Sequence, residues 1–183
     1  SPVAVVVTEG ISGRFEDTLV LPPGETGEIA IRGPNVTPGY WNREDATAQS
    51  FHAGWFLTGD VGHMDADGFF YLVDRKSDMI LSGGFNVYPR EIDEVLFNHP
   101  SIREAATVGK KHERLGEVLV AFVALEKDAN LDEEAFFAYC KENLVKYKRP
   151  VEVTFIDALP RTGTNKIDRI TMRAWSAKGS SGA

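Results

Sequence analysis

A single lysine, Lys166, follows threonine, glycine and asparagine in the segment LPRTGTNKIDR, residues 159–169. The segment joins a strand-like run to a run with helical character, so a flexible loop is expected to carry the ammonium group. It is not a phosphate-binding P-loop, because G-x-x-x-x-G-K-[ST] would need glycine where the chain has Pro160 and Asn165. From the residues alone, Lys166 is either a solvated surface lysine or a cation delivered to an anionic site.

A second candidate is Asp60, in the segment WFLTGDVG, residues 55–62. Thr58 and Gly59 predict a turn that holds Asp60 at a strand end with its carboxylate free. Such a carboxylate can accept two hydrogen bonds at once, for example from the vicinal hydroxyls of a ribose. The alternative is an aspartate that only closes the turn.

The third candidate segment, YLVDRKSDMILSGGFNVYPREIDEV, spans residues 71–95. Arg75 ends an apolar strand and could contact a sugar or carboxylate, or form half of a surface ion pair. Gly83 and Gly84 interrupt a strand pattern, which predicts a bulge or the close approach of another group to the backbone. The polar run DRKSD has the composition of a hinge.

Metal and thiol chemistry have little support. The one cysteine, Cys140, lies in a helix-like stretch with no histidine near it in sequence, so we expect a buried structural thiol rather than a nucleophile. The four histidines do not show the spacing of a zinc site, and no metal-ligating residue is assigned.

The whole chain has 183 residues and a formal net charge of -7, which disfavours nucleic acid and anionic membranes as partners. It contains no apolar run of 18 residues, so no transmembrane segment is expected, and the sequence is typical of a cytoplasmic protein. Residues 176–183 are expected to be a disordered tail or a cloning remnant.

The elements that position these residues fall into two parts. Residues 1–75 read as short strands between turn signals, notably 3–8, 27–33 and 68–74, and predict a small β-barrel-like subdomain. Residues 78–175 mix strands with three helices and predict a compact α+β lid domain with a three-stranded sheet. The expected helices are 89–99, 131–144 capped by Asn130, and 167–175. Residues 76–77 separate the two parts.

These segments, together with GEIAIRGPNVTPGYWNREDAT (27–47), occur in the order seen in the adenylate-forming superfamily of acyl-CoA synthetases, luciferases and peptide-synthetase adenylation domains, which the chain resembles over about residues 20–175. The resemblance favours the fatty acyl-CoA synthetases. It implies roles for six residues: Lys166 as the adenylation lysine, Asp60 and Arg75 as ribose contacts of ATP, Ser77 as the hinge, and Gly83 and Gly84 as the pair beside the CoA arm. Two positions depart from the family pattern: Ser77 stands where the family usually has a charged residue, and Asn165 stands where it usually has glycine before the lysine.

The resemblance also implies that the phosphate loop, the magnesium ligand and the acyl pocket belong to a large N-terminal lobe that this sequence does not show. We therefore expect the C-terminal part of an enzyme that uses ATP, Mg²⁺ and CoA to activate a fatty acid, with this chain inactive alone. Its partners would be the missing lobe and its substrates, with a homodimer through an exposed subdomain face as a further expectation. Two alternatives stay open: a noncatalytic interaction module, and an adenylation domain that loads a carrier protein.

Overall fold

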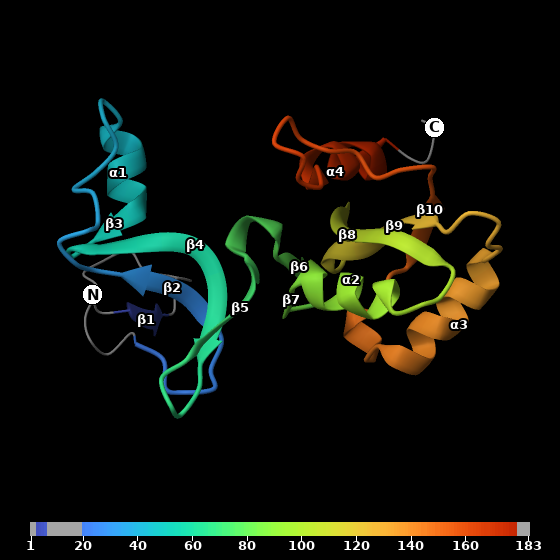
Figure 1. Cartoon of the computed structure of the whole chain (residues 1–183), viewed down its shortest axis with the longest axis horizontal. Helices are drawn as coiled ribbons and strands as arrows, with labels where there is room; N and C mark the ends of the chain where they lie inside the picture. The colour runs from blue at the N-terminus through green and yellow to red at the C-terminus, as the bar shows by residue number, and fades with distance from the viewer. Residues whose placement is uncertain (1–2, 7–19, 179–183) are drawn as a thin grey trace. The chain divides into compact units, whose positions relative to one another are not determined.

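The chain divides into two units, Ser1–Ser77 (unit 1) and Asp78–Ala183 (unit 2). The computed structural model describes residues 3–6 and 20–178 (Figure 1). The predicted strand at 3–8 is therefore seen only over Val3–Val6, and the expected tail at 179–183 lies outside the described residues. Ser176 and Ala177, expected in that tail, belong to the last helix.

Unit 1 is built on one antiparallel sheet of five strands, in the order β1-β2-β4-β3, with β5 also paired to β4 (Figure 1). Its elements are β1 (Val3–Val6), β2 (Gly27–Ile31), α1 (Glu44–Ser50), β3 (Phe51–His52), β4 (Trp55–Met64) and β5 (Phe70–Arg75). No ladder joins β5 to β1 among the described residues, so the barrel-like subdomain that the sequence predicts is an open sheet rather than a closed barrel. The long strand β4 pairs with β3 near its start and with β5 over its second half.

The core of unit 1 is small. Ala4 and Ala30 are buried, and the partly buried Trp55 and Leu57 pack against them. Further along the chain, Phe69, Tyr71 and Leu72 are exposed, so the hairpin from β4 to β5 presents an apolar surface.

Unit 2 contains a second sheet of five strands, not the three that the sequence predicted. The order is β10-β9-β6-β7, with β8 on β9; β10 runs parallel to β9 and the other pairs are antiparallel. The elements are η2 (Lys76–Asp78, which begins in unit 1), β6 (Ile80–Ser82), β7 (Phe85–Val87), α2 (Pro89–Phe97), β8 (Ile102–His112), β9 (Gly116–Leu125), α3 (Glu133–Asn143), η3 (Lys146–Lys148), β10 (Glu152–Phe155) and α4 (Arg169–Ala177). The α+β class predicted from the sequence is confirmed.

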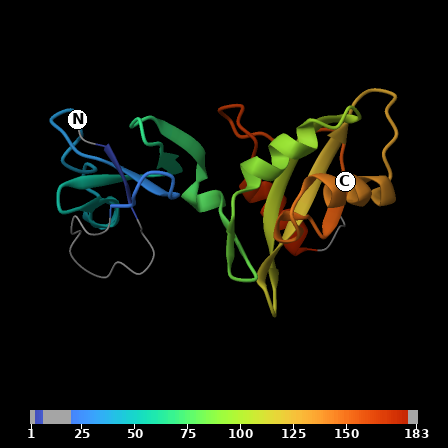
Figure 2. The ribbon, with the colours of Figure 1, turned by 90° about the horizontal axis from the view of Figure 1, so that it is seen from below.

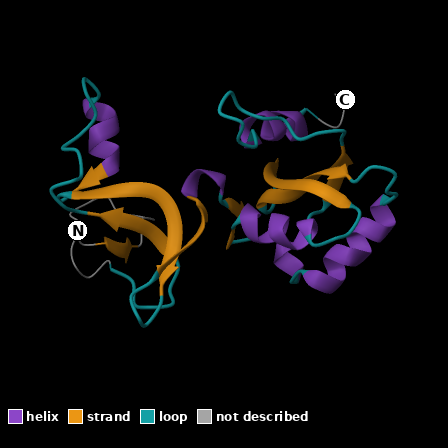
Figure 3. Ribbon diagram, in the orientation of Figure 1, coloured by secondary structure: helices purple, strands orange, loops and turns teal. Residues whose placement is uncertain are grey.

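Helices cover both faces of this sheet (Figures 1, 2 and 3). Alternate side chains of β9 point to opposite sides, as the two-residue period of a strand requires. Leu119, Ala121 and Val123 belong to one core, which also contains Ile92 and Leu96 of α2 and Phe136 and Cys140 of α3. Val120 and Phe122 belong to the other core, with Met172 of α4. The helix α4 therefore lies on the opposite face from α2 and α3.

The helix ends follow from local chemistry. Pro89 occupies the first turn of α2, where its missing N–H is not needed. The cap of α3 is Asp132, whose carboxylate accepts the Ala135 N–H at 2.8 Å. The predicted cap, Asn130, is therefore wrong by two residues. Asp168 caps α4 in the same way. None of the helices in the described residues has the length and apolar character needed to span a bilayer.

Candidate active site

Asp60 and Arg75 form an ion pair across two neighbouring strands of unit 1. Asp60 lies within β4 rather than at a strand end, and it is directly opposite Arg75 in the β4–β5 ladder. Arg75 Nε contacts Asp60 Oδ1 at 2.9 Å, so the carboxylate is not free as predicted. Both side chains remain solvent-accessible, with relative exposures of 34% for Asp60 and 58% for Arg75. The pair therefore offers an acceptor and donors side by side, a combination that suits hydroxyl groups.

The backbone beside Asp60 is held by a buried glutamate that the sequence analysis missed. Glu28 of β2 is 5% exposed, and its carboxylate accepts the Gly59 N–H at 3.0 Å and a hydrogen bond from Lys76 Nζ at 2.9 Å. Gly59 has φ +74°, a conformation that favours glycine, and lies inside β4 rather than in the predicted turn. Glu28 shares the period-two face of the buried Ala30, which is the signal that could have revealed it.

Ser77 follows these residues in the single turn of 3-10 helix Lys76–Asp78. The residue before Ser77 makes its contact within unit 1, and the residue after it makes its contacts within unit 2. Lys76 binds Glu28 of unit 1, whereas Asp78 contacts Arg169 and Arg173 of unit 2. The division between the units falls directly after Ser77.

Gly83 and Gly84 form a two-residue hairpin turn between β6 and β7, not a bulge. Ser82 pairs with Phe85 across the turn, and both glycines have positive φ, +57° and +85°. Two consecutive residues with positive φ are the requirement of a type I′ hairpin, which explains why glycine occupies both places. The Gly83 N–H is bound to the Leu115 carbonyl at 2.9 Å, which fixes the turn against the loop before β9.

A cavity of about 560 Å³ opens beside this turn, entirely within unit 2. Gly83, Phe85 and Tyr147 line it together with two cations, Lys146 and Arg149. The rings of Phe85 and Tyr147 are stacked with centroids 4.5 Å apart. The cavity thus combines an apolar, aromatic wall with positive charge.

Lys166 ends an ordered turn rather than a flexible loop. Thr162 N–H donates to the Lys166 carbonyl at 2.8 Å, and Asn165 N–H donates to the Thr162 carbonyl at 2.9 Å. Asn165 has φ +61°, and asparagine tolerates this region better than most residues other than glycine. Arg161 and Ile167 close the turn with a β-bridge. Lys166 itself is exposed, so the turn fixes the backbone and leaves the ammonium accessible.

Both ends of this turn are anchored. Arg161 forms an ion pair with Glu104 of β8, and its Nη1 donates to the Asn165 carbonyl at 3.3 Å. At the other end, the Asp168 N–H donates to the Pro160 carbonyl at 2.8 Å. No cluster of three or more His, Cys, Asp or Glu side chains in the described ranges has the arrangement of a metal site.

Residues 91–166 match the family model of the AMP-binding enzyme C-terminal domain. The matched segment begins in α2 and ends at Lys166, so that it includes Asp93, the cavity residues of η3 and the lysine-bearing turn.

Relatives extend the similarity beyond the C-terminal domain. A 2-succinylbenzoate–CoA ligase of Geobacillus kaustophilus is 52% identical over 155 residues, which cover 85% of this chain and 32% of that enzyme. The o-succinylbenzoate CoA synthetase of Bacillus subtilis, solved with its acyl-adenylate intermediate, is 40% identical with a TM-score of 0.79, covering 93% of this chain and 34% of that one. The ATP-bound MatB of Rhodopseudomonas palustris is 34% identical with a TM-score of 0.86, covering 96% and 34%. The Bacillus subtilis enzyme has also been solved with ATP and a magnesium ion.

Two expectations change with these findings. The curated relatives carry the name of 2-succinylbenzoate ligases, so the predicted fatty acid substrate is not supported. The homodimer expected from the exposed face of unit 1 has no support either. The chain spans about a third of the length of the curated relatives that it matches.

Proposed function

We infer that this chain is the C-terminal part of an AMP-forming acid–CoA ligase, and that the acid is 2-succinylbenzoate or a close aromatic dicarboxylate. The observation that carries the inference is the 52% identity to a 2-succinylbenzoate–CoA ligase over 85% of the chain. The alternatives of an interaction module and of a carrier-loading domain are not favoured, because the curated relatives are named CoA ligases.

Asp60 and Arg75 are proposed to bind the ribose of ATP and of the acyl-adenylate. A ribose diol both donates and accepts hydrogen bonds, and the pair supplies a carboxylate acceptor next to guanidinium donors. Glu28 supports this role indirectly, because its bond to Gly59 fixes the backbone one residue before Asp60.

Lys166 is proposed to act in the adenylation step. The exposed ammonium would lie between the acid carboxylate and the α-phosphate while the carboxylate oxygen attacks phosphorus and pyrophosphate leaves. Its charge offsets the negative charge that grows on the phosphate oxygens, and a preorganised donor of this kind contributes about 10²–10³ in rate. The ordered turn supports the proposal because its hydrogen bonds involve the backbone of Lys166 and not its ammonium group.

Gly83 and Gly84 are proposed to border the path of CoA in the second step. The cavity beside Gly83 carries Lys146 and Arg149, which suit the phosphates of CoA, and an aromatic wall that suits its adenine. Ser77 is proposed as the hinge between the two steps. The magnesium ion is proposed to be bound by residues of the complete ligase outside this chain.

The proposal is tested with the complete ligase that contains this chain. We expect AMP release with ATP, Mg²⁺, CoA and 2-succinylbenzoate, and much weaker release with malonate or a medium-chain fatty acid. The 183-residue chain alone should release none. A complete enzyme that prefers a fatty acid would refute the acid assignment, and one that never forms AMP would refute the ligase assignment.

The role of Lys166 is tested in the same enzyme by Lys166→Ala. We expect the adenylation rate to fall about 10²–10³-fold, while the transfer of a supplied acyl-adenylate to CoA stays within a few-fold of the parent enzyme. Lys111→Ala, which removes another exposed lysine of unit 2, is the matched control and should leave both steps unchanged. An equal loss in both steps would contradict the assigned role.

A further inference from the structure

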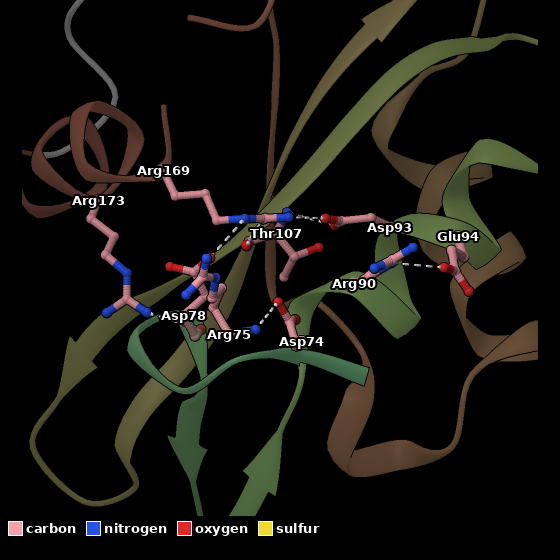
Figure 4. A network of polar contacts seen from close by, with 9 residues as sticks. All are labelled: Asp74, Arg75, Asp78, Arg90, Asp93, Glu94, Thr107, Arg169 and Arg173. Atoms are coloured by element: carbon pink, nitrogen blue, oxygen red, sulfur yellow. Dashed lines mark hydrogen bonds and ion pairs between the residues drawn. The ribbon is translucent and has the colours of Figure 1, made fainter. Parts of the chain in front are cut away.

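An ion-pair network in unit 2 centres on Arg169, the first residue of α4 (Figure 4). Its Nη2 contacts Asp93 Oδ2 of α2 at 2.6 Å, and its Nη1 donates to the Thr107 carbonyl of β8 at 2.8 Å. Its Nε lies 3.7 Å from the carboxylate of Asp78. The side chains of Arg169 and Asp93 are only 16% and 13% exposed. One guanidinium group thus joins α4 to three other elements.

A second arginine, one turn further along α4, reinforces the contact with Asp78. Arg173 Nη2 donates to the Asp78 carbonyl at 3.2 Å, and its Nη1 lies 3.4 Å from Glu117 of β9. Figure 4 shows both arginines leaving α4 on the side that faces Asp78. Asp78 is therefore held through its carboxylate and its carbonyl, and it directly follows the proposed hinge residue Ser77.

The lysine-bearing turn is tied closely to this helix. Asp168 caps α4 by accepting the Thr171 N–H at 3.0 Å, and its own N–H donates to the Pro160 carbonyl at 2.8 Å. Only two residues, Ile167 and Asp168, separate Lys166 from Arg169, and both take part in the bonds that close the turn. The position of Lys166 in unit 2 therefore follows the position of α4.

The chemistry of the network suits a role in positioning. A buried ion pair loses the hydration of both charges, so it is a poor source of stability compared with apolar packing of similar volume. The planar guanidinium, in contrast, fixes the direction of each of its bonds. Arg169 contacts Asp93, Thr107 and Asp78. Because these contacts are directional, they restrict the position of the first turn of α4 more than the apolar contacts of Met172 would.

We propose that Arg169 is a positioning residue for Lys166: it holds the lysine-bearing turn and the hinge-side residue Asp78 in one rigid body. The proposal rests on the proposed function, because it gives Lys166 its role in adenylation. Arg169 touches no substrate in this scheme. It acts on the reaction only by fixing the place from which the ammonium is presented.

The first test uses the 183-residue chain and needs no activity. Amide hydrogen exchange is compared for the parent chain, Arg169→Met and the control Lys110→Met, which breaks the ion pair of Lys110 with Glu152 in the same unit. In Arg169→Met, we expect the Thr162, Asn165 and Asp168 amides to exchange at least about 10-fold faster relative to the β8–β9 amides. In the control, this ratio should not change. Equal acceleration of the turn and the ladder would show a purely structural role and overturn the proposal.

The second test uses the complete ligase and separates the two steps. Arg169→Met should lower adenylation about 10²-fold, because an error of about 1 Å in a reacting group can cost that much. The transfer of a supplied acyl-adenylate to CoA should change less than about threefold, since that step does not need Lys166. Arg169→Lys keeps the positive charge but loses the planar guanidinium group with its several donors, and should give an intermediate adenylation rate. Adenylation at the parent rate in both variants would overturn the proposal.

Two further outcomes are separable. If Arg169→Met does not fold, Asp78→Asn replaces it, because this change weakens the Arg169–Asp78 contact and leaves the Arg169–Asp93 pair intact. It should accelerate hydrogen exchange of the amides of residues 78–82 and slow adenylation. A variant unchanged in both would count against the proposal. If the parent enzyme forms no adenylate with any acid, the proposed function fails, whereas the exchange result still decides whether Arg169 orders the turn.

Discussion

Asn165 shows how one residue can meet a backbone requirement that usually selects glycine. Its φ of +61° lies in the left-handed region, where glycine is unstrained and asparagine is tolerated. The superfamily resemblance leads one to expect glycine at this place, and the positive φ gives the physical reason. The departure therefore leaves the geometry of the turn intact.

Two substitutions of Asn165 should show whether the positive φ at this position matters for adenylation. Asn165→Gly is expected to keep adenylation by the complete ligase within about twofold, because glycine adopts the same φ. Asn165→Val places a β-branched side chain at positive φ, which costs about 1–2 kcal/mol, and should disturb the turn and slow adenylation about 10-fold. Single-turnover formation of acyl-adenylate measures both. Equal rates for the glycine and valine variants would contradict the importance of this conformation.

At the scale of the elements, the strands β2 and β4 are joined by more than their ladder. Glu28 of β2 reaches the Gly59 N–H at the irregular part of β4 and also binds Lys76, just after β5. One buried carboxylate therefore links three segments around the Asp60–Arg75 pair. The arrangement supports a fixed spacing between β4 and the end of β5.

Two substitutions of Glu28 should differ in their effect on unit 1. Glu28→Ala leaves the Gly59 N–H without its acceptor and is expected to lower the free energy of unfolding by about 1–3 kcal/mol. Glu28→Gln keeps an oxygen acceptor for that N–H and should cost clearly less. Urea unfolding followed through Trp55, which is in unit 1, measures the difference, with Glu25→Ala in an exposed turn as the control. A glutamine variant as unstable as the alanine variant would show that charge, not the acceptor, matters.

Much of the element pattern could be predicted from sequence, and the failures have physical causes. Pro89 with Ile92, Val95 and Leu96 predicts α2 because the proline and the three-four spacing agree. The Asp60–Arg75 pair could not be predicted, because it depends on the register of a hairpin whose strands are paired irregularly. Gly83 and Gly84 interrupt a strand pattern, which predicts a bulge or a close approach to the backbone, whereas their positive φ values form a hairpin turn. Glu28 drew no prediction, although its place on the same strand face as the buried Ala30 indicates burial, because the need for a buried carboxylate shows only in its partners Gly59 and Lys76.

At the scale of the whole molecule, stability and pH are linked through Asp93. Burial raises the pKa of Asp93 from 3.8 to about 6, and the nearby Arg169 opposes this rise without cancelling it. The folded chain thus holds this proton more tightly than the unfolded chain. The contribution of Asp93 to stability is fully present below about pH 4 and is lost as pH rises through 6, with a span of up to about 3 kcal/mol.

The pH dependence can be isolated with Asp93→Asn, which cannot ionise. Between pH 4 and pH 7, the free energy of unfolding of the parent chain should fall by up to about 3 kcal/mol relative to that of this variant. Trp175 fluorescence reports on unit 2 when Trp41 and Trp55 are replaced by phenylalanine. A difference that does not vary with pH would contradict the raised pKa.

Ser77 is the one residue between Lys76, which is bound in unit 1, and Asp78, which is bound in unit 2. Chain length at this place should consequently be under much stricter control than in an exposed loop such as residues 22–25. Each inserted residue would add two rotatable torsions between the anchored neighbours, whereas a deletion would pull one anchor from its partner. Under the proposed hinge role of Ser77, changing the number of residues here would alter the exchange between the two proposed steps without changing any residue proposed to contact substrate.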